Sequence, residues 1–392
     1  MTFENAIESI DRFGSELRSY LSICQNMGGN VKSLSAHAKQ QWDNVLEEAE
    51  KRNGWFTREN IILSLTNLSP WFSADALHNW LKPYNISFRG KNPLNIGIIM
   101  PGNIPFAGLH DLLCVLLTGN KPVIKLSGSD TALMQFIIDK LKEAEPEWNA
   151  LMCRKDLYNG NSSSAPFPVK ELDAVIATGS NNSAKHFEYY FKNIPSVIRR
   201  NRNSAAVLDG SETEDELGML GRDIFSYYGL GCRNISKLYI PYSYNFNSFF
   251  RNIEKYGSVI NHHKYANNYL YNRTVFLMDG VKFSDNDFLL LVENPAITSP
   301  CATVYFEYYT DLPALANHLC GESEKIQCIA CNERIKDELL QYIMASALKR
   351  VFVNLGQTQS PALTDYADGK DVIEFLLNIS KATIKKHKAK TA

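Results

Sequence analysis

Between residues 94 and 200, short apolar runs alternate with longer amphipathic segments, and this alternation constrains the fold more than any other feature of the sequence. Residues 94–100 form a β-branched run that ends at Pro101-Gly102-Asn103, and a helical pattern follows over residues 106–117. A strand at residues 122–125, a helix at 130–143 and a strand at 172–177 continue the order. Because strands joined through helices of this length run parallel, the region is predicted to be an α/β nucleotide-binding unit.

The flanking regions predict two further parts. Residues 3–84 have a helical pattern with helix-start signals at Thr57 and Ser73, which predicts an N-terminal helical layer. A second α/β unit begins at about residue 205. We therefore expect residues 1–203 to combine the N-terminal helices with the nucleotide-binding domain, residues 204–355 to form a second α/β domain, and residues 356–392 to be a C-terminal return segment and tail.

Composition excludes several classes of function. The 392 residues are 45% hydrophobic and 21% charged, which suits an ordinary globular protein with two packed domains. A formal net charge of −1 argues against a surface built for nucleic acid or for a membrane. The sequence has no apolar stretch near the roughly 20 residues that span a bilayer and no secretory pattern at its start, so we expect a cytoplasmic protein without a membrane span.

Eight cysteines are scattered without a disulfide framework and are expected to be reduced. Cys232 stands out because it follows Gly229-Leu230-Gly231 and precedes Arg233. Glycines allow a ligand to approach the backbone, and nearby cations favour the nucleophilic thiolate. The alternative is a buried structural cysteine, which is the usual fate of a single thiol.

Two tempting metal or redox motifs are interpreted as structural. Cys328 and Cys331 form a lone CxxC inside an apolar run that predicts a buried strand. His262 and His263 are adjacent, so their side chains point apart, and no partner stands at ligand spacing. We expect no metal.

Successive loops of the chain resemble landmarks of the aldehyde dehydrogenase superfamily. They are Pro101-Gly-Asn103-Ile-Pro105, Gly119-Asn-Lys-Pro-Val-Ile-Lys125-Leu-Ser127, Ala177-Thr-Gly179-Ser180 and Gly231-Cys232. More narrowly, residues 53–60 and 355–369 are similar to the fatty acyl-CoA reductase (LuxC-type) family, whose best-known member supplies aldehyde to bacterial luciferase. The resemblance implies an α/β, aldehyde-dehydrogenase-like fold. Residues 1–203 would combine the N-terminal helical layer with a Rossmann-type domain that binds NADP, and residues 204–355 would form the α/β catalytic domain.

The resemblance also implies roles for individual residues. Cys232 is the expected nucleophile, and the Asn103 amide is expected to donate to the acyl oxygen. Lys125 and Ser127 are expected to hold the adenosine ribose or its phosphate. Because Gly128 stands where NAD-preferring relatives commonly have an acidic residue, NADPH is the expected cofactor.

Two further cofactor contacts follow from the same resemblance. Gly179 and Ser180 open a helix directly after a strand, where N–H groups and the helix dipole can bind a phosphate. The alternative is that Ser180 is a plain helix cap. Glu293 precedes Ser299-Pro300 roughly as a ribose-binding Glu precedes a Gly-Pro in the superfamily, with a spacing that differs.

The chain departs from hydrolytic aldehyde dehydrogenases at the position of their catalytic glutamate. The equivalent stretch is residues 198–204, and the glutamate position corresponds to Arg199. A site without that base should hydrolyse a thioester slowly and keep the acyl-enzyme until it is reduced. Arg199, Arg200 and Arg202 could meet phosphates of the acyl carrier, although surface ion pairing is the more usual role of such a cluster.

The predicted function is NADPH-dependent reduction of a fatty acyl thioester, either acyl-CoA or a carrier-bound acyl group, to an aldehyde through an acyl-cysteine. Two alternatives stay open: an acyl-phosphate reductase of the glutamyl-phosphate type, and a non-catalytic subunit that holds an acyl group in a multienzyme complex. Expected partners are the acyl substrate, an acyl transferase or synthetase, and further copies of the chain in a homo-oligomer.

Overall fold

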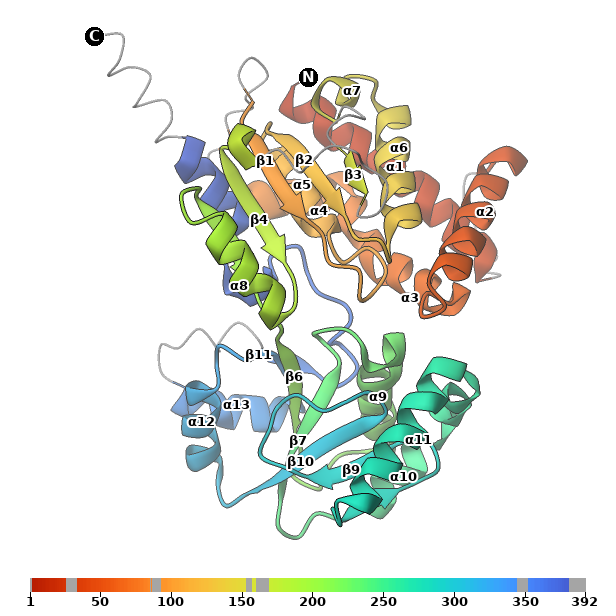
Figure 1. Cartoon of the computed structure of the whole chain (residues 1–392), viewed down its shortest axis with the longest axis vertical. Helices are drawn as coiled ribbons and strands as arrows, with labels where there is room; N and C mark the ends of the chain where they lie inside the picture. Colours follow the sequence, from red (N-terminus) through yellow and green to blue (C-terminus); the bar gives the residue numbers. More distant parts are fainter. Residues whose placement is uncertain are drawn as a thin grey trace. The chain divides into compact units, whose positions relative to one another are not determined.

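A computed structural model describes residues 2–25, 34–84, 86, 93–152, 157–159, 169–343 and 352–380. The chain divides into two compact units (Figure 1). The first comprises Met1–Arg200, Ala362–Tyr366 and Lys370–Ala392, and the second comprises Asn201–Pro361 and Ala367–Gly369. In the described parts of the chain, no helix is both long enough and apolar enough to cross a membrane.

The N-terminal helical layer of the first unit is confirmed. Its helices are α1 (Phe3–Cys24), α2 (Ala36–Arg52), α3 (Arg58–Leu68) and α4 (Ala74–Leu81), with a short 3-10 helix at Ser69–Phe72. Thr57 and Ser73 cap α3 and α4 as predicted, because each side chain accepts a hydrogen bond from a backbone N–H in the first turn. Local capping chemistry therefore fixes where these helices begin.

The first unit contains a five-stranded parallel sheet in the order β3-β2-β1-β4-β5. Its strands are β1 (Asn95–Ile99), β2 (Lys121–Leu126), β3 (Leu157–Asn159), β4 (Ala174–Thr178) and β5 (Ser196–Arg199), and its helices are α5 (Leu109–Leu117), α6 (Thr131–Ala144), α7 (Trp148–Leu151) and α8 (Asn181–Tyr190). The strand order reverses between β1 and β4, where open α/β sheets bind ligands at the carboxyl ends of the strands.

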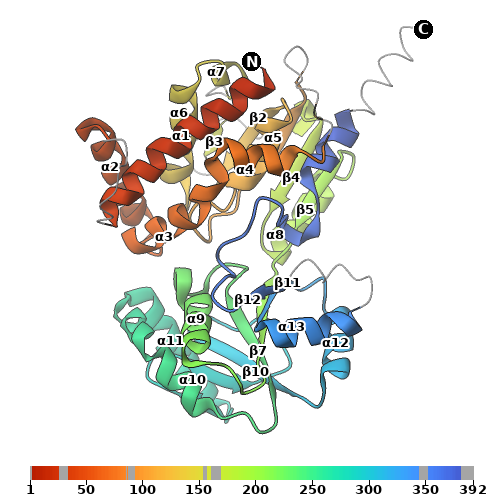
Figure 2. The same ribbon diagram turned by 180° about the vertical axis from the view of Figure 1, so that it is seen from behind.

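Helices cover both faces of this sheet. Figure 1 shows α8 in front of β4, and Figure 2 shows α1 and α4 in front of the sheet from the other side. Alternate strand residues serve the two faces: Ile98 and Ile176 join the large core with the N-terminal helices, whereas Val175 packs with Phe191 beside α8. Burial on both faces explains why the strands are continuous apolar runs.

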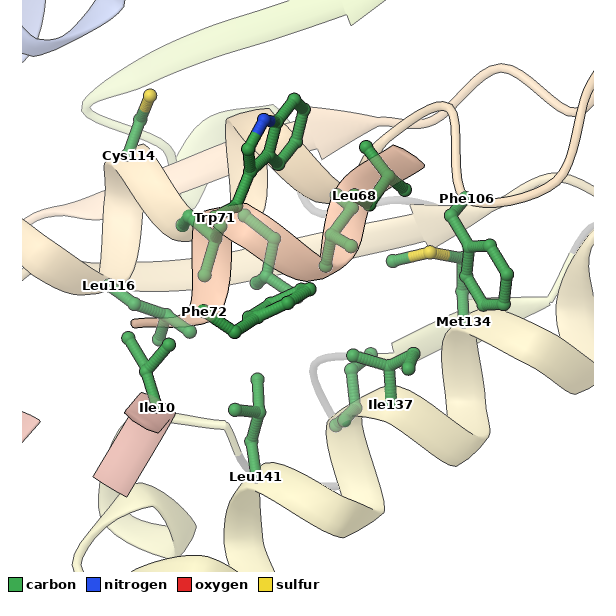
Figure 3. Packing of buried hydrophobic residues seen from close by; sticks show 14 of the residues in the cluster. Ile10, Leu68, Trp71, Phe72, Phe106, Cys114, Leu116, Met134, Ile137 and Leu141 are labelled. Atoms are coloured by element: carbon green, nitrogen blue, oxygen red, sulfur yellow. The ribbon is translucent and has the colours of Figure 1, made fainter. Parts of the chain in front are cut away.

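The large core of the first unit draws on segments that are distant in sequence. Figure 3 shows Phe72 lying among apolar side chains that include Leu116 and Leu141, with Phe106 beside Met134. Leu363, Val372, Ile373 and Leu376 of the C-terminal segment belong to the same cluster. The end of the described chain is therefore an integral part of the first unit.

The second unit contains a seven-stranded sheet in the order β12-β11-β6-β7-β10-β9-β8. Its strands are β6 (Asn203–Val207), β7 (Ile235–Pro241), β8 (Phe283–Asp285), β9 (Leu290–Glu293), β10 (Thr303–Tyr309), β11 (Ile326–Cys331) and β12 (Phe352–Asn354), and its helices are α9 (Glu214–Phe225), α10 (Phe246–Ile253), α11 (His263–Met278), α12 (Leu312–Gly321) and α13 (Glu333–Tyr342). All described pairings are parallel except β8 with β9.

Candidate active site

Cys232 lies in a turn that connects a 3-10 helix (Ser226–Gly229) to β7 in the second unit. It is exposed, and it stands at the amino end of β7. The hydroxyl of Ser204, at the start of β6, donates to the carbonyl oxygen of Cys232 at 3.0 Å. The side chain of Cys232 is therefore accessible while its backbone is attached to the neighbouring strand.

The turn before Cys232 has an unusual backbone. Tyr227, Tyr228 and Gly229 have φ values of 52°, 57° and 76°, so three consecutive residues are left-handed. A non-glycine residue in this region costs about 1–3 kcal/mol. The Tyr228 ring stacks on His262 at a centroid distance of 4.3 Å, and the Cys301 thiol donates to the Tyr228 carbonyl at 3.6 Å. The surrounding structure therefore maintains a strained turn directly before the predicted nucleophile.

The other thiols differ from Cys232. Among the described cysteines, Cys232 is the one that is exposed. Burial raises the pKa of Cys301 and of Cys328 to about 11 and that of Cys331 to about 12. Since the thiolate is the nucleophile, thiols with a raised pKa are poorly suited to attack a carbonyl.

Asn103 lies in the loop that follows β1, and its side chain is exposed. The loop is anchored at two points. The backbone N–H of Phe106, which has a φ of 61°, donates to the buried Asp130 carboxylate at 2.8 Å, and Ser64 donates to the carbonyl of Pro105 at 3.1 Å. Burial raises the pKa of Asp130 well above its usual range. A buried acid at the start of α6 therefore shapes the loop that carries Asn103.

Lys125 and Ser127 lie at the end of β2 and just beyond it, next to the loop after β1. A Cβ at Gly102 would lie 2.1 Å from the Ser127 hydroxyl, so the two loops can meet only because residue 102 is glycine. A Cβ at Gly128 would meet no heavy atom within 4 Å. The carboxyl ends of β1 and β2 thus form one continuous edge with open space beside Ser127.

Gly179 and Ser180 follow β4 at the same edge of the first sheet. Ser180 caps α8, because its hydroxyl accepts from the Ser183 backbone N–H at 3.2 Å. A Cβ at Gly179 would lie 2.9 Å from that of Ser183 and 3.0 Å from the Phe187 ring, so helix packing alone requires glycine there. The local structure of these residues needs no ligand, although the N-terminus of α8 stands at the edge where ligands of such sheets bind.

Arg199, which the resemblance to aldehyde dehydrogenases is expected to place at the position of their catalytic glutamate, forms a buried ion pair. It lies at the end of β5 and contacts the Asp111 carboxylate of α5 through two hydrogen bonds of 2.6 and 3.0 Å. Both side chains are at least nine-tenths buried. A guanidinium held in this way is a structural cation, and the position offers no group that could activate water.

The three arginines do not form one cationic surface. Arg200 pairs with Glu188 at 2.6 Å on the surface of the first unit. Arg202, in the second unit, pairs with Asp368 at 3.1 Å and donates to the carbonyls of Ser323 and Ile326. Ion pairing therefore describes all three, and for Arg199 the pair is buried rather than at the surface.

Glu293 is exposed at the end of β9, in the second unit. Its partner in the sheet is Phe306, which pairs with Leu238 of β7, six residues after Cys232. Along the direction of the strands, Glu293 is therefore in register with the middle of β7, whereas Cys232 precedes the amino end of that strand. The loop after β9 returns toward the amino ends of the strands, where the Thr298 hydroxyl donates to the Asn203 side chain at 2.8 Å.

The two motifs interpreted as structural have local explanations. Cys328 and Cys331 lie on β11, which is buried at every position, so the predicted buried strand is confirmed. His262 caps α11, with its Nδ1 accepting from the Tyr265 backbone N–H at 3.4 Å. Across the described ranges, no group of three or more His, Cys, Asp or Glu side chains could hold a metal ion.

Sequence reasoning missed several buried polar residues that shape the site. Asp130 supports the Asn103 loop, while Asp223 and Asn234 support the turn before Cys232. A weak signal existed for Asp223, because it falls on the apolar face of a helix beside Leu220 and Ile224. Asn234 gave no signal beyond its closeness to Cys232 in the sequence.

A family model described as acyl-CoA reductase (LuxC) matches residues 2–240, more than half of the chain. In the comparison with curated protein sequences, none matches this chain.

Solved structures of aldehyde dehydrogenases share the fold. An NAD⁺ complex of the enzyme from Bacillus cereus has a TM-score of 0.61 at 10% identity, covering 90% of this chain and 76% of that one. Aldehyde dehydrogenase 21 from Physcomitrella patens has a TM-score of 0.61 at 11% identity, with 97% and 89% covered. An acetylating aldehyde dehydrogenase from Geobacillus thermoglucosidasius has a TM-score of 0.60 at 11% identity, with 94% and 84% covered. The predicted α/β, aldehyde-dehydrogenase-like fold is confirmed.

Proposed function

The chain belongs to the acyl-CoA reductase (LuxC) family of aldehyde-forming oxidoreductases, and from this premise we propose that it reduces a fatty acyl thioester to an aldehyde through an acyl group on Cys232, with NADPH as the reductant. The observation that carries the proposal is the exposed Cys232 thiol at the end of a left-handed turn, in a chain whose other described thiols are buried or half-buried.

The first step is acyl transfer to Cys232. Its thiolate attacks the carbonyl carbon of the thioester, forming a carbon–sulfur bond while the carbonyl electron pair moves onto oxygen. The tetrahedral species collapses when the bond to the carrier sulfur breaks, and the carrier thiolate leaves with that electron pair. Asn103 donates to the oxyanion together with the Cys232 backbone N–H, and one preorganised donor of this kind can lower the barrier by about 3 kcal/mol.

The acyl-cysteine then has to survive until it is reduced. The buried Arg199–Asp111 pair supports this requirement, because the position of the hydrolytic glutamate holds a cation that is already bound to a carboxylate. Without a general base at that position, water is a poor competitor for the acyl group. Addition of a hydride to the acyl carbon would give the oxyanion of a thiohemiacetal on Cys232. As the electron pair on that oxygen re-forms the carbonyl of the aldehyde, the carbon–sulfur bond breaks and Cys232 returns to the thiolate.

The first unit suits a nicotinamide dinucleotide. The carboxyl edge of its sheet brings the loops after β1 and β2 into contact through Gly102 and Ser127, leaves open space beside Gly128, and includes the N-terminus of α8. We assign the adenosine ribose and its phosphate to Lys125 and Ser127, and a bridging phosphate to Gly179 and Ser180. When bound, NADPH supplies the hydride that reduces the acyl group. Glu293, which the resemblance assigns to a cofactor ribose, is in register with Leu238 of β7 rather than with the turn that carries Cys232.

The test is to incubate the protein with a mass-tagged long-chain acyl-CoA, locate the modified residue by peptide mapping, and then add NADPH. We expect the tag on Cys232, no tag in Cys232→Ser, and discharge as aldehyde when NADPH is added. Cys320, a half-buried thiol on α12 of the same unit, supplies the matched control, since Cys320→Ser should still be tagged.

Other outcomes separate the alternatives. A tag on another cysteine would refute the assignment of the nucleophile. Turnover of an acyl phosphate in preference to acyl-CoA would favour the acyl-phosphate reductase. No tag, together with no binding of NADPH by fluorescence, would favour a non-catalytic subunit that holds an acyl group or its carrier.

A further inference from the structure

The left-handed turn before Cys232 needs an explanation for its stability. Tyr227 and Tyr228 both adopt a backbone conformation that residues with a Cβ rarely occupy. A turn of this kind persists only where neighbouring groups over-determine it. Hydrogen bonds to the backbone carbonyls at the start of the turn and to the backbone N–H groups at its end could stabilise this conformation.

A single buried side chain holds both ends of the turn. Asn234 is 2% exposed, and its Oδ1 accepts from the Gly231 backbone N–H at 2.8 Å. Its Nδ2 donates to the carbonyls of Ser226 at 2.8 Å, Asp223 at 2.9 Å and Ile224 at 3.3 Å. A neutral amide is suited to this place because it combines an acceptor with two donors in one plane.

The helix end that Asn234 holds is itself fixed to a distant segment. The Asp223 carboxylate accepts from the Gly356 N–H at 2.6 Å and from the Thr358 N–H and hydroxyl at 3.2 and 2.7 Å. Arg233 donates to the Thr358 carbonyl at 3.4 Å. The segment after β12 carries part of the resemblance to acyl-CoA reductases. Its hydrogen bonds therefore stabilise the residues on both sides of the same turn.

We propose that Asn234 is a positioning residue that sets the direction of the Cys232 thiol through the left-handed turn. The proposal rests on the proposed function, which makes Cys232 the nucleophile. Asn234 is buried and acts through the backbone that delivers the sulfur. Without its hydrogen bonds the turn can relax toward a commoner conformation, and a displacement of about 1 Å at a reacting atom lowers a rate by about 10²-fold.

The experiment compares two reactions of the same thiol in Asn234→Ala and Asn234→Asp. Acylation of Cys232 by the mass-tagged acyl-CoA needs an oriented sulfur, whereas alkylation by iodoacetamide needs only an accessible one. We expect acylation to fall by about 10²-fold in both variants while alkylation changes little. If Asn234→Ala does not fold, Asn234→Asp carries the test, because its carboxylate keeps an acceptor for Gly231.

The pH profile of Asn234→Asp adds a readout that a purely structural role would not change. A neutral carboxyl group can donate one hydrogen bond to the carbonyls that the carboxylate would repel. The acylation rate of the variant relative to the wild type should therefore rise as the pH is lowered from about 8 toward about 5. Taking the ratio at each pH removes the changes in rate that both proteins share.

Asn332→Ala is the matched control, because Asn332 caps α13 in the same unit by accepting from Ile335 at 2.9 Å. It should lower thermal stability without changing acylation. Equal losses of acylation and alkylation in the Asn234 variants, or acylation at the wild-type rate, would overturn the positioning role alone. Wild-type protein that is alkylated but takes no acyl tag at Cys232 would overturn the proposed function and this role with it.

Discussion

The first sheet carries its candidate residues at the carboxyl ends of its strands, whereas the second sheet carries the candidate nucleophile at an amino end. In the first unit, Asn103, Ser127 and Ser180 follow the carboxyl ends of neighbouring parallel strands, where the reversal of strand order brings loops together. In the second unit, Cys232 precedes β7 and so stands at the amino end of its strand. Topology therefore assembles the first set, whereas the second depends on side chains that fix one turn.

This difference shows in the kinds of interaction at each edge. The first edge relies mainly on close backbone approach and local caps, such as Gly102 against Ser127 and the Ser180 cap of α8. The second relies on buried hydrogen bonds between groups far apart in sequence, such as Asp223 with Thr358. Buried polar networks specify a single conformation only when every member is satisfied. We therefore expect a single substitution to disturb the conformation of the turn before Cys232 more than it disturbs most loops at the carboxyl edge of the first sheet.

The Arg199–Asp111 pair is the exception in the first unit, and it gives the largest effect on stability. Arg199→Met leaves a buried carboxylate without its cation and should lower the free energy of unfolding by about 3–5 kcal/mol. The double variant Arg199→Met with Asp111→Leu should recover most of that loss. Arg200→Met, which breaks the exposed pair with Glu188, should cost no more than about 1 kcal/mol. Denaturant titration measures all three, and equal losses in the single and double variants would show that the charge pair is not the cause.

The Asn103 substitution tests whether the first edge contributes to chemistry as well as to binding. Asn103→Ala leaves the Phe106–Asp130 and Ser64–Pro105 anchors in place, so the loop should keep its shape. Loss of one oxyanion donor should lower kcat by about 10²–10³-fold. Asn95, which donates to the Glu171 carbonyl at the other end of β1, provides the matched control. A similar loss of kcat in Asn95→Ala would mean that the effect is structural.

The sequence predicted the parts of the fold that local chemistry determines. Caps at Thr57 and Ser73, the buried strand around Cys328 and the alternation of strands and helices all follow from residues close together in the chain. The pairing of Asp111 with Arg199 joins residues 88 positions apart, and no local pattern marks it. The same holds for Asp223, whose partners lie 133 and 135 residues away.

The sequence placed Ser127 and Gly179 just after strands, and the structure has them there, while their cofactor roles stay predictions. The roles of Ser127 and Gly179 were assigned from the resemblance to aldehyde dehydrogenases, and the packing of Ser183 and Phe187 gives a separate reason for glycine at 179. Glu293 was assigned from the resemblance, with a spacing to Ser299-Pro300 that differs from that of the superfamily, and such a match does not reveal how far along the strands a residue lies. Asn234 was missed because a buried amide resembles any other polar residue until its partners are known.

The buried carboxyl group of Asp223 should make the stability of the second unit depend on pH. Burial raises the pKa of Asp223 to about 6, from a usual value of 3.8. Below about pH 4 the carboxyl is protonated in both folded and unfolded chains and has no effect, whereas between about pH 4 and pH 6 only the unfolded chain ionises. The free energy of unfolding should therefore fall by about 3 kcal/mol across that range because of this group.

Asp223→Asn isolates that contribution. The variant should be less stable throughout, because its amide places an N–H against a backbone N–H, but it should lack this part of the slope. Asp130 and Glu212, whose pKa values burial also raises, titrate in both proteins and cancel in the difference. Urea titrations at several pH values measure the difference in the free energy of unfolding between the two proteins. If that difference does not change with pH, the role assigned to Asp223 is contradicted.

The smallest expected effect concerns the cofactor edge of the first unit. Lys125→Ala removes the cation assigned to the ribose phosphate, so the Kd for NADPH should rise by roughly 10-fold, or about 1.4 kcal/mol, with a smaller change for NADH. Lys121 lies on the same face of β2, four residues earlier and at the other end of the strand, so Lys121→Ala should leave both constants unchanged. Fluorescence titration of the two cofactors measures the difference. Equal weakening of NADPH and NADH by Lys125→Ala would place the lysine against a part that the cofactors share, and the preference for NADPH would then need another origin than this strand.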